Sequence, residues 1–132
     1  MKYLIDTDIA SYYLRGKYNL LEVFKNKGPL NLRLSVVTLA QMQVLAYKNP
    51  HSKINLSSIG NLARWLSLLD IDRNTWEIFS RTKAELDKRG KPRGDLDILQ
   101  ASIAKQHDLI VITHNTNHYE DIIECEDWTK CS

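Results

Sequence analysis

A helix followed by a buried strand, between residues 94 and 115, constrains the fold of this 132-residue chain more than any other stretch. The run Leu109–Thr113 is short, rich in β-branched residues and almost uninterrupted, as in a parallel strand covered on both faces. A helix feeding such a strand indicates an α/β fold. In open α/β sheets ligands bind beyond the carboxyl ends of the strands, so Thr113 and Asn115 lie where we expect a site.

Two carboxylates stand at the start of this helix. Asp95 has a suitable side chain to cap it, and Asp97 then falls in its first turn. A negative charge there meets the positive end of the helix macrodipole. Both carboxylates are therefore expected at one end of the helix.

A second acidic cluster follows the first strand. The apolar run Lys2–Ile5 leads directly to Asp6, Thr7 and Asp8. Asp6 would lie at the strand's carboxyl end, while Thr7 or Asp8 would cap a helix that stops at Gly16. Such a cluster alone would be interpreted as turn and capping residues. The acids at positions 95 and 97 favour a shared site instead.

The remaining chain alternates between the two kinds of element, within one expected domain spanning residues 1–132. We expect helices at 20–24, from 38 to about 48, at 56–69 and at 74–88, and strands at 32–37 and 69–71. A chain of this length can bury about two thirds of the surface that it exposes when unfolded. Trp65 is expected in the core or an interface, and Trp76, Phe79 and Leu86 are expected to be buried.

Composition excludes little. The net charge of +2 does not by itself require a nucleic-acid partner, so any basic surface must be local. Cys125 and Cys131 do not have the spacing of a metal site. No signal peptide or membrane-spanning run is evident, and we expect a cytoplasmic protein with reduced thiols.

A local basic segment leads into the acids at positions 95 and 97. Six cations lie between positions 81 and 93, against Glu85 and Asp87. A helix ending in Lys and Arg can simply be a solvated end that suits the macrodipole. Beside carboxylates, however, cations can hold a phosphodiester backbone. The candidates for this role are Lys88, Arg89, Lys91 and Arg93.

Bringing Asp6, Asp95 and Asp97 together requires a counter-charge. Two unit charges at 4 Å repel by about 1 kcal/mol in water and by about 4 kcal/mol at an intermediate dielectric. A bound cation removes this cost, and an oxygen-only ligand set favours Mg²⁺ or Mn²⁺ over zinc. The spacing of His114 and His118 suits loop or capping roles better than metal ligation.

Four motifs in this order resemble those of PIN-domain ribonucleases, and VapC-like toxins of bacterial toxin–antitoxin pairs in particular. They are Ile5-Asp6-Thr7-Asp8, the block 35–42 (SVVTLAQM), Gly94-Asp95-Leu96-Asp97, and Thr113-His114-Asn115-Thr116. The resemblance covers nearly the whole chain. It implies an α/β/α sandwich with a central, mainly parallel sheet, a Mg²⁺ or Mn²⁺ site, endonucleolytic cleavage of RNA with tRNA as a candidate substrate, inhibition by a VapB-type antitoxin, and a homodimer.

The resemblance also implies residue roles. The family's first and third acids fall on Asp6 and Asp97, and Asn115 takes a fourth, more variable polar position. These three residues would hold the metal. Thr7, Asp95 and Thr113 would support them, and the basic residues at 88–93 would contact RNA.

The chain departs from the family pattern at the second acid, where Ala-Glu-Leu reads Ala40-Gln41-Met42. Gln41 keeps an oxygen and nearly the same shape but cannot act as a base. Activity is therefore expected to be weakened or lost. Gln100 replaces a residue that is more often apolar in the family, a change expected not to affect the chemistry.

Two alternatives remain open on the sequence alone. Asp6-Thr7-Asp8 also fits the Asp-x-Asp of haloacid dehalogenase-like phosphatases, in which Asp6 would form an aspartyl-phosphate. That family places Thr or Val where this chain has Ala10. The second alternative is a PIN fold that binds RNA or a protein without cleaving, because Gln41 has weakened the site.

Overall fold

The protein is built on a sheet of five parallel strands, described here from a computed structural model that covers residues 2–130. The strand order is β3-β2-β1-β4-β5. The strands are β1 (Tyr3–Ile5), β2 (Leu32–Ser35), β3 (Leu68–Leu69), β4 (Ile110–Ile112) and β5 (Cys125–Glu126). β1 lies at the centre, with Ile5 paired to Ile112 of β4.

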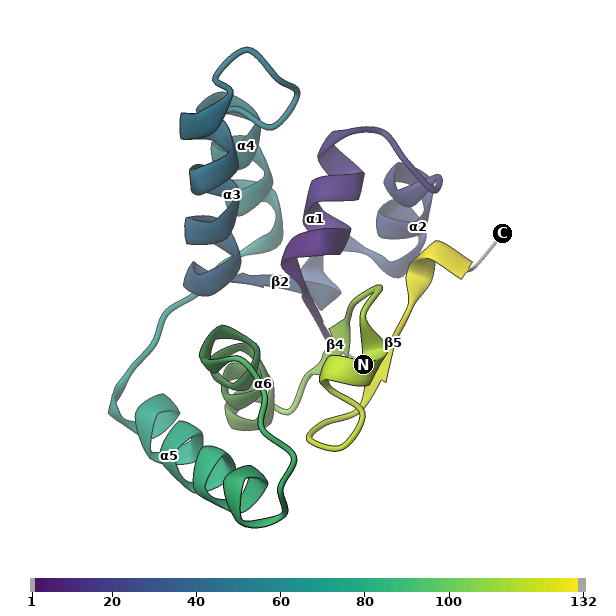
Figure 1. The fold of residues 1–132 in the computed structure, drawn as a ribbon. Coiled ribbons are helices and arrows are strands. Elements are labelled where there is room, and N and C mark those ends of the chain that lie inside the picture. The colour runs from purple at the N-terminus through teal and green to yellow at the C-terminus, as the bar shows by residue number, and fades with distance from the viewer. Residues whose placement is uncertain (1, 131–132) are drawn as a thin grey trace.

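Six helices surround this sheet (Figure 1). They are α1 (Thr7–Leu14), α2 (Leu20–Lys27), α3 (Val36–Lys48), α4 (Leu56–Leu66), α5 (Arg73–Lys88) and α6 (Asp95–His107). Figure 1 shows α3 and α4 standing beside α1 and α2, while α5 and α6 lie at the other end of the molecule. Short 3₁₀ turns occur at Pro29–Asn31, Thr116–His118 and Trp128–Lys130.

The core has two halves, one on each face of the sheet. Ile5, Ile110 and Ile112 point into the half formed with α1 to α4, whereas Leu4 and Val111 point into the half formed with α6. This alternation along β1 and β4 is the period-two pattern of strands covered on both faces. The architecture is the α/β/α sandwich with a central parallel sheet that the motifs imply.

Several element boundaries differ from the sequence-based expectation. Val36 and Val37 begin α3 rather than ending β2, because the buried Ser35 side chain accepts a hydrogen bond from the Thr38 backbone N–H and caps the helix there. The short edge strand β5 was not expected. Trp76 was expected to be buried but is 49% exposed, because it lies on the outward face of α5 beside Phe79.

The predicted helix caps at the two acidic clusters are also wrong. Asp6, not Thr7 or Asp8, caps α1, and its carboxylate accepts from the Thr7 backbone N–H. Gly94 occupies the cap position of α6, so Asp95 is the first helical residue and makes no capping bond. Asp6 is thus the last residue between a central strand and a helix, which fixes its side chain at the sheet edge.

Two further observations concern the sequence-based expectations on membrane and thiols. Among residues 2–130 no helix has both the length and the apolar character needed to cross a membrane. Cys125 is a free, partly buried thiol. Cys131 lies outside the described residues.

Candidate active site

A cavity of about 360 Å³ lies at the carboxyl edge of the sheet, where α1, α3 and α6 begin. It brings together Asp6, Gln41, Asp97 and Asn115, which come from four different segments of the chain. Its other lining residues are Thr7, Asp8, Ser11, Tyr12, Arg15, Leu45 and His118. The first strand, the third helix and the segment from 94 to 115 therefore converge here, as the motif order suggested.

Three hydrogen-bond donors hold the half-buried Asp6 carboxylate in place. Its Oδ1 accepts from the Thr7 backbone N–H at 2.9 Å and from Gln100 Nε2 at 3.2 Å, and its Oδ2 accepts from Thr113 Oγ1 at 2.9 Å. Burial, with a smaller contribution from the negative charge of Asp8, raises the pKa of Asp6 to about 6. Asp6 is therefore a positioned carboxylate that forms no salt bridge within residues 2–130.

Gln41 faces the same cavity from the second turn of α3. Its Oε1 accepts a hydrogen bond from Thr7 Oγ1. This contact fixes the amide close to Asp6 and gives Thr7 a supporting place in the site. The amide carries no negative charge and has no basic site with which to take a proton from water.

Asp97 reaches the cavity from the first turn of α6 and contacts two side chains after β4. Tyr119 donates its hydroxyl to Asp97 Oδ1 at 3.3 Å, and His118 Nδ1 lies 3.2 Å from Asp97 Oδ2. The Tyr119 side chain is only 1% exposed, and its burial beside Asp6 and Asp97 raises the pKa of its hydroxyl well above the ordinary value. The hydroxyl is thus a fixed neutral donor between two acids.

Asp8 holds the loop that carries Asn115. One oxygen, Oδ2, accepts from the His114 backbone N–H at 2.9 Å and from Asn115 Nδ2 at 3.2 Å. Because the nitrogen of the Asn115 amide is used in this way, its oxygen remains available to the cavity. Thr113, predicted as a supporting residue, is buried and connects this loop to Asp6.

Gln100 corrects a sequence-based expectation. It was expected not to affect the chemistry, but its Nε2 donates to Asp6 and, at 2.9 Å, to Thr38 Oγ1. Its Oε1 accepts from Ser35 Oγ, and the side chain is 1% exposed. Gln100 therefore links the Asp6 carboxylate to the start of α3, the helix that carries Gln41.

Tyr119 and Gln100 were both missed as site residues. Gln100 gave a usable signal, because it is a polar residue one turn after Asp97 on a helix face that is otherwise apolar. Tyr119 gave none, since a single aromatic residue after a strand is usually core.

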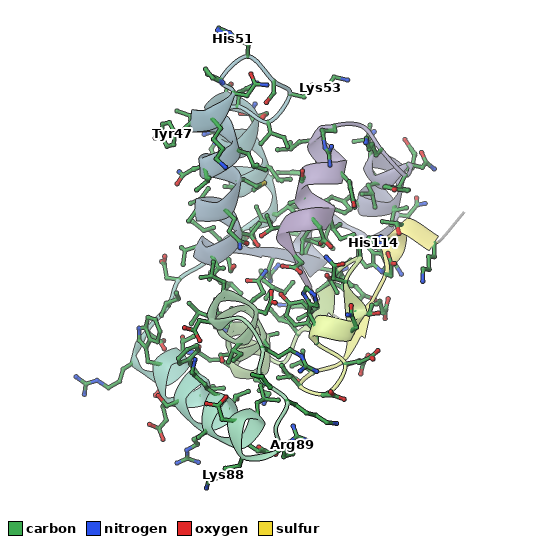
Figure 2. The ribbon with its side chains drawn as sticks, viewed as in Figure 1. Tyr47, His51, Lys53, Lys88, Arg89 and His114 are labelled. Atoms are coloured by element: carbon green, nitrogen blue, oxygen red, sulfur yellow. The ribbon has the colours of Figure 1, made fainter. Side chains whose placement is uncertain are left out.

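Other predicted residues are not brought to the cavity. Asp95 is exposed and pairs with Lys83. Arg93 and Lys91 both pair with Asp121, at 2.8 and 3.8 Å, and Arg89 lies 3.9 Å from Glu85. Figure 2 shows Lys88 and Arg89 at the outer end of α5. Contact of this segment with RNA stays a prediction, and the charge pairing speaks against it.

The donor atoms of the cavity suit a hard divalent cation. Asp6 and Asp97 offer carboxylate oxygens, and Gln41 and Asn115 offer amide oxygens, a set that fits Mg²⁺ or Mn²⁺. Within residues 2–130 no group of three His, Cys, Asp or Glu side chains is arranged to hold a metal ion. The oxygen ligands thus suit such an ion, but the neutral amide at position 41 gives the set one negative charge fewer than a carboxylate there would.

Comparison with known proteins decides the family. The family model of the PIN domain matches residues 3–122. This chain belongs to the PIN-domain family. A curated relative, Ribonuclease VapC2 of Haemophilus influenzae, is 30% identical over 97% of this chain and 98% of its own. The tRNA(fMet)-specific endonuclease VapC of Shigella flexneri is 28% identical over 98% of this chain and 99% of its own.

A solved structure extends the match to three dimensions. DNA-bound VapBC from Salmonella typhimurium superposes with a TM-score of 0.88, at 27% identity over 97% of this PIN domain and 98% of the matched chain. The family assignment confirms the resemblance to VapC-type PIN ribonucleases seen in the four motifs. The alternative that this chain is a haloacid dehalogenase-like phosphatase is therefore wrong.

Proposed function

We propose that this PIN domain is a Mg²⁺- or Mn²⁺-dependent endoribonuclease in which Gln41 weakens catalysis. The observation that carries the proposal is the single cavity shared by Asp6, Asp97 and residue 41, at the carboxyl edge of a PIN-type sheet. Asp6, Asp97 and Asn115 would hold the ion. When bound, it would polarise the scissile phosphate and acidify the attacking water.

The side chains of the chain have separate tasks in this proposal. Gln100, Thr113 and the Thr7 backbone N–H keep the Asp6 carboxylate in one orientation, and Tyr119 does the same for Asp97. Gln41 can orient a water through its amide but cannot remove the water's proton. Loss of a general base typically reduces a rate by about 10² to 10⁴-fold.

The proposed substrate and antitoxin partner are taken from the descriptions of related proteins. The Shigella flexneri relative carries the description of a tRNA(fMet)-specific endonuclease, and structural neighbours are VapBC complexes. We therefore propose tRNA as a substrate class, a VapB-type antitoxin as the inhibitor, a homodimeric state and a cytoplasmic location. The non-cleaving RNA- or protein-binding module stays the second candidate because position 41 lacks its carboxylate.

A metal titration with an RNA-cleavage assay tests the proposal. Millimolar Mn²⁺ should raise the melting temperature of the wild type, since a ligand that binds only the folded state stabilises it. Asp97→Asn should remove most of this rise. RNA fragments should appear slowly in Mn²⁺ and not in EDTA.

The two candidate functions differ in this experiment. RNA binding without any Mn²⁺-dependent fragments, even at stoichiometric protein, would favour the non-cleaving module. If Mn²⁺ changes the melting temperature of neither the wild type nor Asp97→Asn, the proposed metal site itself is contradicted.

A further inference from the structure

A second hollow, of about 370 Å³, lies next to the acidic cavity and has the opposite charge. It is lined by Arg15, Lys17, Ser52, Lys53 and Ile54, with no carboxylate among them. Arg15 lines both hollows, so the two are neighbours on either side of this residue. We call the residues Arg15, Lys17 and Lys53 the basic strip.

The charges of the basic strip are not neutralised by the protein. In the part of the chain that the structure describes, none of the three cations has a carboxylate within 4.0 Å, whereas five of the six cations between positions 81 and 93 do. The helix macrodipole accounts for Arg15, which follows the last turn of α1. It does not account for Lys53, which comes from the loop between α3 and α4.

The backbones that carry the basic strip are fixed. The Lys53 carbonyl accepts from Ser58 Oγ at 2.8 Å, and the next residue, Ile54, is buried in the core. The Arg15 guanidinium lies 5.3 Å from the centre of the Tyr12 ring, and the Lys17 backbone N–H donates to the Tyr12 carbonyl at 2.9 Å. Figure 2 shows Lys53 on the loop at the top of α3 and α4, far from Lys88 and Arg89.

An aromatic side chain accompanies these cations. Tyr18 is 47% exposed and packs edge-to-face against Tyr12, with ring centres 4.9 Å apart. Its backbone is left-handed, with φ of 59°, a conformation that disfavours an aromatic residue. Non-glycine residues in this backbone region cluster at active sites and ligand clamps.

We propose that single-stranded RNA leaves the acidic cavity past Arg15 and binds along the basic strip, with phosphates on the three cations and a base on Tyr18. The proposal rests on the ribonuclease function proposed above, and it says on which side of the active site the RNA strand lies. Uncompensated cations with an exposed aromatic ring are the combination that binds single strands without sequence readout. An acidic protein segment is the competing occupant, and the experiment distinguishes it.

The test measures binding without cleavage. A fluorescein-labelled single-stranded RNA of about 12 nucleotides, comparable with known site sizes, is titrated with protein in EDTA at several salt concentrations. The variant carries Arg15→Gln, Lys17→Gln and Lys53→Gln. The matched control carries Lys88→Gln, Arg89→Gln and Lys91→Gln, which removes the same charge. All six residues are exposed, so both variants should fold, as thermal melting checks.

The basic-strip variant should bind at least about tenfold more weakly at physiological salt. Its plot of log K against log salt should flatten by about two units, since each phosphate contact on a single strand contributes about 0.7. The control should lose less than about twofold. Equal losses in the two variants, or no loss in the first, would overturn the proposal.

Two further measurements separate the possible failures. If the basic-strip variant keeps its affinity for RNA but loses affinity for labelled polyglutamate, the surface binds protein and the proposal is overturned. If it loses RNA affinity while the wild type never produces Mn²⁺-dependent fragments, the RNA path stands and the ribonuclease proposal fails. If the basic-strip variant binds RNA as tightly as the wild type and the wild type produces Mn²⁺-dependent fragments, the ribonuclease proposal stands and the RNA path is overturned.

Discussion

The acidic cavity and the basic strip are neighbours that share Arg15, yet they are built in opposite ways. In the cavity the carboxylates are held by donors from within the protein, and among residues 2–130 no buried polar side-chain atom lacks a hydrogen-bond partner. In the basic strip the charged groups are exposed, and none pairs with a carboxylate of the described part of the chain. The side chains of the cavity are therefore positioned before a substrate binds. The cations of the basic strip, in contrast, remain available to bind an anionic partner.

This contrast separates the expected effects of mutation. Substitutions in the cavity should change metal binding and the rate of cleavage, and substitutions around the strip should change RNA affinity and its salt dependence.

The largest effect is expected at position 41. Gln41→Glu should raise Mn²⁺-dependent RNA cleavage by at least about tenfold, equivalent to about 1.4 kcal/mol in the barrier, because it restores an acid beside Asp6. The same change should slightly lower the melting temperature without metal, since a fourth carboxylate adds repulsion to Asp6, Asp8 and Asp97. RNA affinity in EDTA should change little.

Gln43→Glu is the matched control, with the same chemical change on the same helix but outside the cavity lining. It should leave the cleavage rate unchanged. Equal rates for wild type and Gln41→Glu would show that position 41 is not the missing acid. Robust cleavage by the wild type would mean that another carboxylate, such as Asp8, performs its task.

The next effect concerns pH and Asp6. Its pKa is about 6 in the folded protein against an ordinary value of 3.8, so the folded state favours the protonated form. The ionised form costs stability, up to about 3 kcal/mol, and this cost is fully present above pH 6 and absent below about pH 4. Asp6→Asn should therefore raise the metal-free melting temperature at pH 7.5 but not at pH 4.

Two observations would contradict this prediction. One is the same shift in melting temperature at both pH values, which would assign the effect to packing. The other is a matching pH-dependent shift in the control Asp70→Asn, an exposed carboxylate outside the cavity. Mn²⁺ should reduce the loss of melting temperature of the wild type between pH 4 and pH 7.5. The reason is that the ion binds the ionised carboxylate and stabilises the folded state at the higher pH.

Local rules were sufficient to predict an α/β fold and the positions of the main acids. A strand followed by an acid and a helix located Asp6, and an acid in the first turn of a buried helix located Asp97. The alternation of β1 and β4 residues between the two core halves follows from runs of apolar residues covered on both faces. These features depend on neighbours in the sequence. The α/β/α sandwich was implied by the family resemblance, and the structure confirms it.

Features that depend on distant partners could not be predicted. Gln100 contacts Asp6 across 94 positions, and Arg93 is paired by Asp121 across 28 positions. The basic segment at 81–93 was conspicuous in the sequence, but the fold supplies its counter-charges. Arg15 and Lys53 were inconspicuous because they are 38 positions apart, and only the fold places them around one hollow.

A smaller effect is expected from Gln100, which acts on the cavity without lining it. Gln100→Met keeps the volume but removes a donor to Asp6, so Mn²⁺ affinity should fall by about tenfold, the lower end for partners of metal ligands. The control is Gln106→Met, six residues further along the same helix, where the side-chain amide donates to Asp72 instead. It should lower the melting temperature without changing Mn²⁺ affinity, which a melting-temperature titration measures. Equal affinities in both variants would reduce Gln100 to a structural role.

The smallest effect is expected beside the basic strip, at Tyr18. Tyr18→Asn removes a stacking surface, and RNA affinity in EDTA should fall by about fivefold, the low end for stacking on one base. Stability should change by less than about 1 kcal/mol, because Asn tolerates the left-handed backbone that disfavours Tyr, and this gain offsets the lost contact with Tyr12.

Tyr47→Asn is the matched control for this last prediction. Tyr47 is more exposed, at 72%, but Figure 2 shows it on the far side of α3 from α1. Tyr18, in contrast, follows Lys17 of the basic strip and packs on Tyr12, which lines the acidic cavity. If exposure of an aromatic ring were enough, Tyr47→Asn would weaken binding as much as Tyr18→Asn. If the path along the basic strip is correct, only the Tyr18 variant weakens binding, and its salt dependence stays that of the wild type because no phosphate contact is lost.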